Sequence, residues 1–64
     1  MPVSSSAAKK VLKQAGAKRV SDNAASELAD SINGFAYSLA KKAVTLAAHA
    51  KRETVKKEDI ELAK

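Results

Sequence analysis

Hydrophobic residues recur along this chain at intervals of three and four, the spacing of one face of an α-helix. The first such run, from Ala8 to Ala15, predicts a short amphipathic helix of about ten residues. One of the serines at positions 4–6 is expected to cap it, because a hydroxyl accepts hydrogen bonds from the free backbone N–H groups of the first turn. Gly16 follows where a helix commonly ends in a left-handed conformation.

The next run predicts one long helix from Asp22 to Ala50. Its apolar positions keep the helical phase throughout: Ala25, Leu28, Ile32, Phe35, Leu39, Ala43, Leu46 and Ala50. Ser21 is the expected cap, and Asp22 places a negative charge in the first turn, where the helix dipole favours it. Gly34 costs about 1 kcal/mol of helix propensity, but the pattern continues in phase across it, so a single helix is predicted.

A helix of this length predicts a partner chain. From Asp22 to Ala50 it would extend over roughly 43 Å at about 1.5 Å per residue, which is more than two short helices can cover. Its apolar stripe therefore needs a second long helix, and alanines such as Ala36, Ala40 and Ala43 let two helix axes approach closely. We expect an obligate dimer, since a chain of 64 residues also has little core of its own.

A third, short helix is predicted from Lys56 to Ala63, with Ile60 and Ala63 facing the core. The expected fold class is therefore all-α, in the order short helix, long helix, short helix. A chain of this length forms a single domain, which we assign to residues 1–64, with residues 1–6 as a polar N-terminal leader.

Charge is concentrated near the two segments that connect the helices. The chain has 12 Lys and Arg against 7 Asp and Glu, which gives a net charge of +5. Residues 1–20 and residues 41–52 are both basic and contain no acid, whereas the stretch between them is mildly acidic. Two basic zones of this kind are typical of a polyanion-binding face built from two connectors. The alternative is that the lysines only keep a small domain soluble.

Several classes of protein are disfavoured by what the sequence lacks. Without cysteine, and with His49 as its one histidine, the chain has no ligand set for structural zinc and no thiol nucleophile. No glycine-rich phosphate loop is present, so we expect no enzyme activity, no metal and no cofactor.

No apolar run is long enough to span a membrane and the N-terminus lacks a signal-peptide core, so a cytoplasmic protein is expected. An alanine-rich stripe also makes a poor membrane-surface helix.

Two strings, AGAKRVSDNA at 15–24 and KKAVTLAAHAKRETVKKEDIELA at 41–63, resemble the archaeal histones. The resemblance covers nearly the whole chain from about Lys9. It implies a histone fold, in which two chains pair head to tail as a handshake dimer and the first connector of one lies beside the second connector of the other. It further implies a chromosome-associated protein that bends, wraps and compacts double-stranded DNA largely without sequence preference.

The resemblance also implies roles for individual residues. The expected DNA contacts are Lys10, Lys13, Arg19, Thr54 and Lys56, with Arg19 entering the minor groove. The expected junction between dimers consists of Leu46, His49, Asp59 and Leu62, with the histidine and the aspartate hydrogen-bonded across it. Arg52 and Asp59 are expected to form a structural ion pair that shapes the second connector.

One further position corresponds to a functional position of the family, and two positions depart from its usual residues. Gly16 corresponds to the small residue at which successive turns of a protein–DNA superhelix can approach. Lys51 stands where the family usually has glycine, and Glu53 stands where it usually has a basic residue.

Two functions remain open from the sequence. The first is a DNA-compacting histone. The second is a histone-fold interaction subunit that pairs with a different protein in a transcription or DNA-associated complex. Basic residues at both connectors favour the first, because a subunit relieved of DNA binding has little need of them. The sequence leaves open whether the chain forms a homodimer or a heterodimer with a paralogue, and whether dimers assemble further on DNA.

Overall fold

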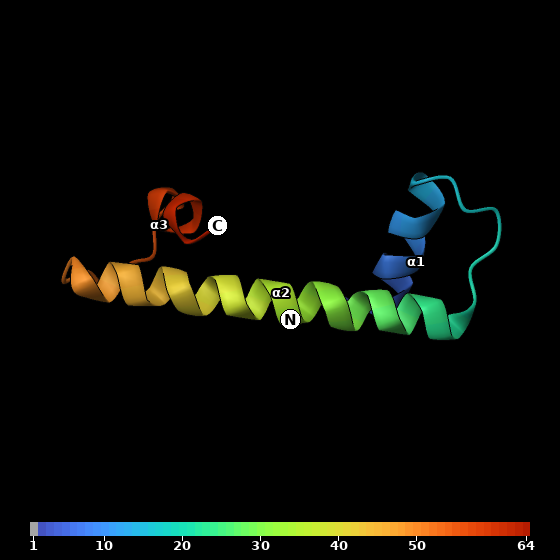
Figure 1. Ribbon diagram of the computed structural model, residues 1–64, viewed down its shortest axis with the longest axis horizontal. Coiled ribbons are helices and arrows are strands. Elements are labelled where there is room, and N and C mark those ends of the chain that lie inside the picture. Colours follow the sequence, from blue (N-terminus) through green and yellow to red (C-terminus); the bar gives the residue numbers. More distant parts are fainter. Residues whose placement is uncertain (1) are drawn as a thin grey trace. The chain divides into compact units, whose positions relative to one another are not determined.

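A computed structural model describes residues 2–64, which form three helices and no strand (Figure 1). Helix α1 spans Ser5–Gln14, α2 spans Asp22–His49 and α3 spans Lys57–Ala63. The predicted all-α order of short, long and short helices is confirmed, and α2 continues through Gly34 without interruption. Because α1 begins at Ser5, two serines of the expected polar leader belong to the helix. None of these helices is both long enough and apolar enough to cross a membrane.

Serine side chains cap the first two helices, as expected. The Ser4 hydroxyl accepts a hydrogen bond from the Ala7 backbone N–H at 3.1 Å, and the Ser21 hydroxyl accepts one from Ala24 at 3.0 Å. Each bond satisfies an N–H group that has no partner within its own helix. Asp22 adds a negative charge at the start of α2, where the helix dipole is positive.

Helix α1 ends in a Schellman motif. The Gly16 N–H donates to the Lys13 carbonyl at 3.0 Å, and the Ala17 N–H donates to the Leu12 carbonyl at 3.1 Å. Gly16 has a φ of 116°, which residues with a side chain rarely adopt, so the glycine predicted to end this helix is required by the backbone.

Helix α2 ends in the same motif without a glycine. The Lys51 N–H donates to the Ala48 carbonyl at 2.9 Å, and the Arg52 N–H donates to the Ala47 carbonyl at 3.0 Å. Lys51 therefore occupies the position that Gly16 occupies after α1, and it adopts a φ of 61°. A side chain in this left-handed region is disfavoured by about 1–2 kcal/mol, so Lys51 stores local strain at the start of the second connector.

Replacing Lys51 with glycine is expected to stabilise the protein by about 0.5–1 kcal/mol, because relief of the strain exceeds the extra entropy that glycine has in the unfolded chain. Chemical denaturation at a fixed protein concentration measures this change. Lys51→Ala is the matched control, since it removes the same charge but keeps the strain. Equal stability of the two variants would show that charge, and not backbone strain, determines the effect.

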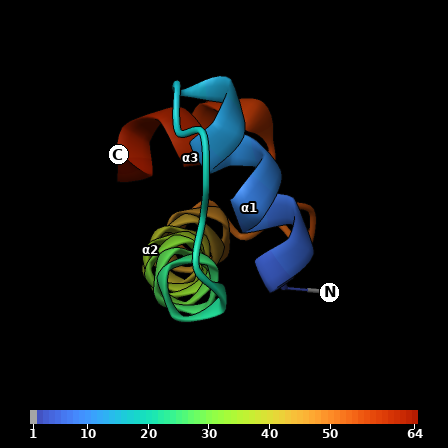
Figure 2. The ribbon, with the colours of Figure 1, turned by 90° about the vertical axis from the view of Figure 1, so that its right-hand side faces the viewer.

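The first compact unit runs to Gly34 and joins α1 to the beginning of α2 (Figure 2). Its core consists of Ala8 from α1 with Ala25 and Ala29 from α2, all buried. A pair of hydrogen bonds also fixes the N-terminal segment: the Val3 N–H donates to Asn33 Oδ1 at 2.7 Å, and Asn33 Nδ2 donates to the Val3 carbonyl at 3.0 Å. Asn33 thus holds the chain ahead of α1 against α2.

The second unit, from Phe35 to Lys64, joins α3 to the end of α2. Its core repeats the pattern of the first, with Ala43 and Ala47 from α2 buried against Ala63 from α3. Ile60, which was expected to face the core, is half-buried.

A single chain buries little apolar surface. In residues 2–64, every buried hydrophobic residue is an alanine, and no larger side chain is fully buried. Several large apolar side chains are exposed, among them Phe35 at 69% and Leu62 at 73%. The accessible surface is 5193 Å², whereas a folded monomer of 6.7 kDa exposes roughly 3,900 Å². The excess surface is available for association with another chain.

Candidate nucleic-acid interface

The second connector is built around a bidentate ion pair between Arg52 and Asp59. Arg52 Nη1 donates to Asp59 Oδ2 at 2.9 Å, and Nη2 donates to Oδ1 at 2.8 Å. The same Nη1 atom also donates to the Thr54 carbonyl at 2.9 Å, and the Lys56 backbone N–H donates to Asp59 Oδ2 at 2.8 Å. One buried carboxylate and one guanidinium therefore fix the backbone at Thr54 and Lys56, two of the expected DNA contacts, whose side chains remain exposed.

These hydrogen bonds stabilise the charged form of Asp59. The Arg52 guanidinium, together with the Lys56 N–H, lowers the pKa of the Asp59 carboxyl from 3.8 to about 2, although burial of the side chain opposes the shift. The same contact raises the pKa of Arg52. Asp59 is 2% exposed, whereas the Arg52 side chain is 27% exposed, so a buried carboxylate is paired with a partly exposed guanidinium. Bidentate geometry of this kind makes the connector rigid.

Because the folded-state pKa of Asp59 is lowered, its contribution to stability is complete above the unfolded-state pKa and is lost as the pH falls towards 2. Carboxyl carbon NMR is expected to give Asp59 a titration midpoint near 2. Arg52→Gln is expected to raise that midpoint, whereas Glu53→Gln, in the same connector, should leave it unchanged. A midpoint at the ordinary value in the native chain would contradict this description of the connector.

The first connector exposes basic side chains between two capped helices. Lys18 and Arg19 are exposed, while Ala17 and Val20 on either side of them are half-buried and anchor the segment. Arg19 lies two residues before Ser21, which caps α2, and the backbone N–H groups at the start of a helix favour an anion. A basic side chain beside the N-terminus of a helix is well suited to contact a phosphate.

Helix α1 adds two further cations to the first unit. Lys10 and Lys13 are both exposed, and neither forms an ion pair within residues 2–64. Lys9, in contrast, lies 3.9 Å from Asp22, an exposed contact that contributes little to stability. The five expected DNA contacts therefore divide between the units, with Lys10, Lys13 and Arg19 in the first and Thr54 and Lys56 in the second.

The four expected junction residues all belong to the second unit. His49 is the last residue of α2 and is exposed, Leu62 on α3 is exposed, and Leu46 is half-buried. Asp59 differs from them, because its oxygens already accept three hydrogen bonds from Arg52 and Lys56. A carboxylate has about four acceptor sites, so most of the hydrogen-bonding capacity of this buried side chain is used within the chain. Within residues 2–64, no group of three or more histidine, cysteine or acidic residues could hold a metal ion.

The order of helices, the ordered connectors and the uncovered apolar face of α2 together define a histone-fold protein. Residues 4–63 match the family described as histone-like transcription factor (CBF/NF-Y) and archaeal histone. The chain is 48% identical over 54 residues to probable archaeal histone 3 of Methanocaldococcus jannaschii, a match that covers 84% of this chain and 81% of that protein. It is 46% identical, with the same coverage, to one of the chains of archaeal histone HAN1 from Thermococcus zilligii.

The chain therefore belongs to the archaeal histone family, and it is a histone-fold protein of the DNA-binding, chromatin class. The resemblance in its sequence to the archaeal histones is confirmed.

Proposed function

We propose that the protein binds, bends and compacts double-stranded DNA as a handshake dimer. The observation that carries this proposal is the ordered second connector, in which the Arg52–Asp59 pair fixes the backbone at Thr54 and Lys56 while their side chains remain exposed. A rigid loop presents its phosphate contacts without first losing conformational entropy, so the binding energy is available to bend DNA.

In a handshake dimer, the first connector of one chain lies beside the second connector of the other. Arg19 of one chain would then act together with Thr54 and Lys56 of its partner. Such paired loops contact the DNA backbone, and an arginine can enter a minor groove that faces the protein. Sequence preference would come mainly from the ease of bending DNA, and affinity would depend strongly on salt.

Further assembly would use the junction of Leu46, His49, Asp59 and Leu62, since His49 and Leu62 are exposed and Leu46, one helical turn before His49, is half-buried. Gly16, exposed and without a side chain, would let successive turns of the protein–DNA superhelix come close. Because both compact units share α2, we treat residues 1–64 as one histone-fold domain that acts at the chromosome.

Micrococcal nuclease digestion of the protein on long duplex DNA tests this function. Protected fragments of regular length would support wrapping. Uniform digestion would overturn it and would favour the alternative function, an interaction subunit that pairs with another protein.

A further inference from the structure

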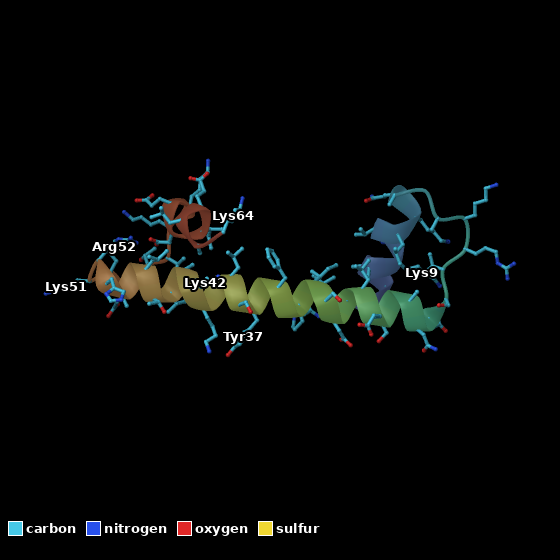
Figure 3. The ribbon with its side chains drawn as sticks, viewed as in Figure 1. Lys9, Tyr37, Lys42, Lys51, Arg52 and Lys64 are labelled. Atoms are coloured by element: carbon cyan, nitrogen blue, oxygen red, sulfur yellow. The ribbon has the colours of Figure 1, made fainter. Side chains whose placement is uncertain are left out.

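Helix α1 is held to the rest of the first unit by few contacts. It has ten residues, and isolated helices shorter than about 12–15 residues are marginal in water, so its position depends on packing. Of these ten described residues only Ala8 is buried, and Val11 is 47% exposed. Lys9 projects from α1 beside the start of α2 (Figure 3), where its exposed ion pair with Asp22 contributes little. Any further contact to this helix therefore matters for where the helix lies.

Asn33 supplies such a contact at the N-terminal end of α1. Its side-chain oxygen accepts a hydrogen bond from the Val3 N–H at 2.7 Å, and its side-chain nitrogen donates to the Val3 carbonyl at 3.0 Å. Val3 comes one residue before the Ser4 cap, so the contact lies directly ahead of the first turn of α1. The first connector ties the other end of α1 to α2. Asn33 and the connector therefore hold α1 at both ends.

The contact depends on the amide of Asn33 and not on the side chain of residue 3. The amide offers one acceptor and one donor to the backbone of a single residue, as the opposite residue does in an antiparallel pair of strands. An ionised aspartate at this position could only accept, and an alanine would make neither bond. The residue type at position 33 therefore decides whether the segment ahead of α1 is fixed.

The placement of α1 in turn determines where Lys10 and Lys13 lie, because both are exposed residues of this helix. We propose that Asn33 is a positioning residue for DNA binding, which acts on these two lysines by holding α1 in place. The inference rests on the proposed function. A helix that is already in place presents its cations without a further loss of conformational entropy on binding.

Asn33→Ala tests the contact. It removes both hydrogen bonds without adding charge, and alanine has the higher helix propensity, so α2 is not weakened. Solvent exchange of the Val3 N–H, measured by NMR, is expected to become about tenfold faster. DNA affinity at fixed salt is expected to fall by about fivefold, since it follows the fraction of α1 helices that are in place in both chains. The matched control is Ser26→Ala, an exposed position two turns earlier on the same face of α2, which should change neither quantity.

A double-mutant cycle separates positioning from a general loss of structure. In a protein that already carries Lys10→Ala and Lys13→Ala, Asn33→Ala should lower DNA affinity no further, because α1 has no cationic contact left to misplace. The Val3 N–H should still exchange faster, since the lysines take no part in its hydrogen bond. The same fivefold loss with and without the two lysines would overturn the positioning role. Unchanged Val3 exchange in Asn33→Ala would overturn the contact itself.

The native protein distinguishes failure of this inference from failure of the proposed function. If the native protein protects DNA and Asn33→Ala binds DNA equally well, the positioning role is wrong and the proposed function stands. If the folded native protein binds no DNA, the proposed function is wrong and the positioning role fails with it, even where slow Val3 exchange shows that the contact exists.

Discussion

Replacing Arg19 and Lys56 together with alanine is expected to lower DNA affinity by about a thousandfold at 0.15 M salt. Each dimer would lose four cationic contacts, because each change is present in both chains. Each contact contributes about 0.9 to the slope of log affinity against log salt concentration, so the slope should become shallower by roughly three to four. A salt titration of binding to a mixed-sequence duplex measures both quantities.

The charge-conserving variant Arg19→Lys with Lys56→Arg is the control for this experiment. It keeps the number of cations, so its salt slope should match that of the native protein. Both double variants should retain the helical signal, since the two side chains are exposed and form no ion pair within residues 2–64. Native affinity in a folded alanine variant would refute the assignment of the DNA-binding face.

The melting temperature is expected to rise with protein concentration, because a chain whose core is built from alanine folds only with its partner. For two 64-residue chains that unfold together, the enthalpy near 60 °C is about 90 kcal/mol, which predicts a shift of about 5 °C for each tenfold change in concentration. Thermal melts followed by circular dichroism over a hundredfold range measure the shift. A constant melting temperature would show that the single chain is stable alone.

Most of the fold follows from local patterns in the sequence. The helical spacing of apolar residues gives the three helices, and the serines at positions 4 and 21 mark the starts of the first two because the hydroxyl bonds are local. The resemblance to the archaeal histones also indicated the pairing of Arg52 with Asp59. What it did not indicate is the extent to which this pair organises the connector, through bonds to the backbone at Thr54 and Lys56.

Other features of the structure could not be predicted from the spacing of apolar and polar residues. Nothing in the sequence pattern gives Asn33 a role, whereas in the structure its amide holds Val3, thirty residues earlier. The left-handed backbone at Lys51 follows from the Schellman motif at the end of α2, and its only sign in the sequence is that the family usually has glycine at this position. An open groove lined in part by Leu46 of α2 and Leu62 of α3 combines residues of both helices, so it forms only where those helices pack.

Micrococcal nuclease digestion on long mixed-sequence DNA tests the central claim most directly. At saturating protein and low salt, the native chain is expected to protect fragments of discrete length, and the Arg19 and Lys56 alanine variant should protect none. A regular ladder would indicate addition of dimers through the Leu46, His49, Asp59 and Leu62 junction, whereas one short length would indicate assembly that stops early. Uniform digestion of DNA by the nuclease in the presence of the folded native protein would contradict the proposal that this histone-fold protein wraps DNA.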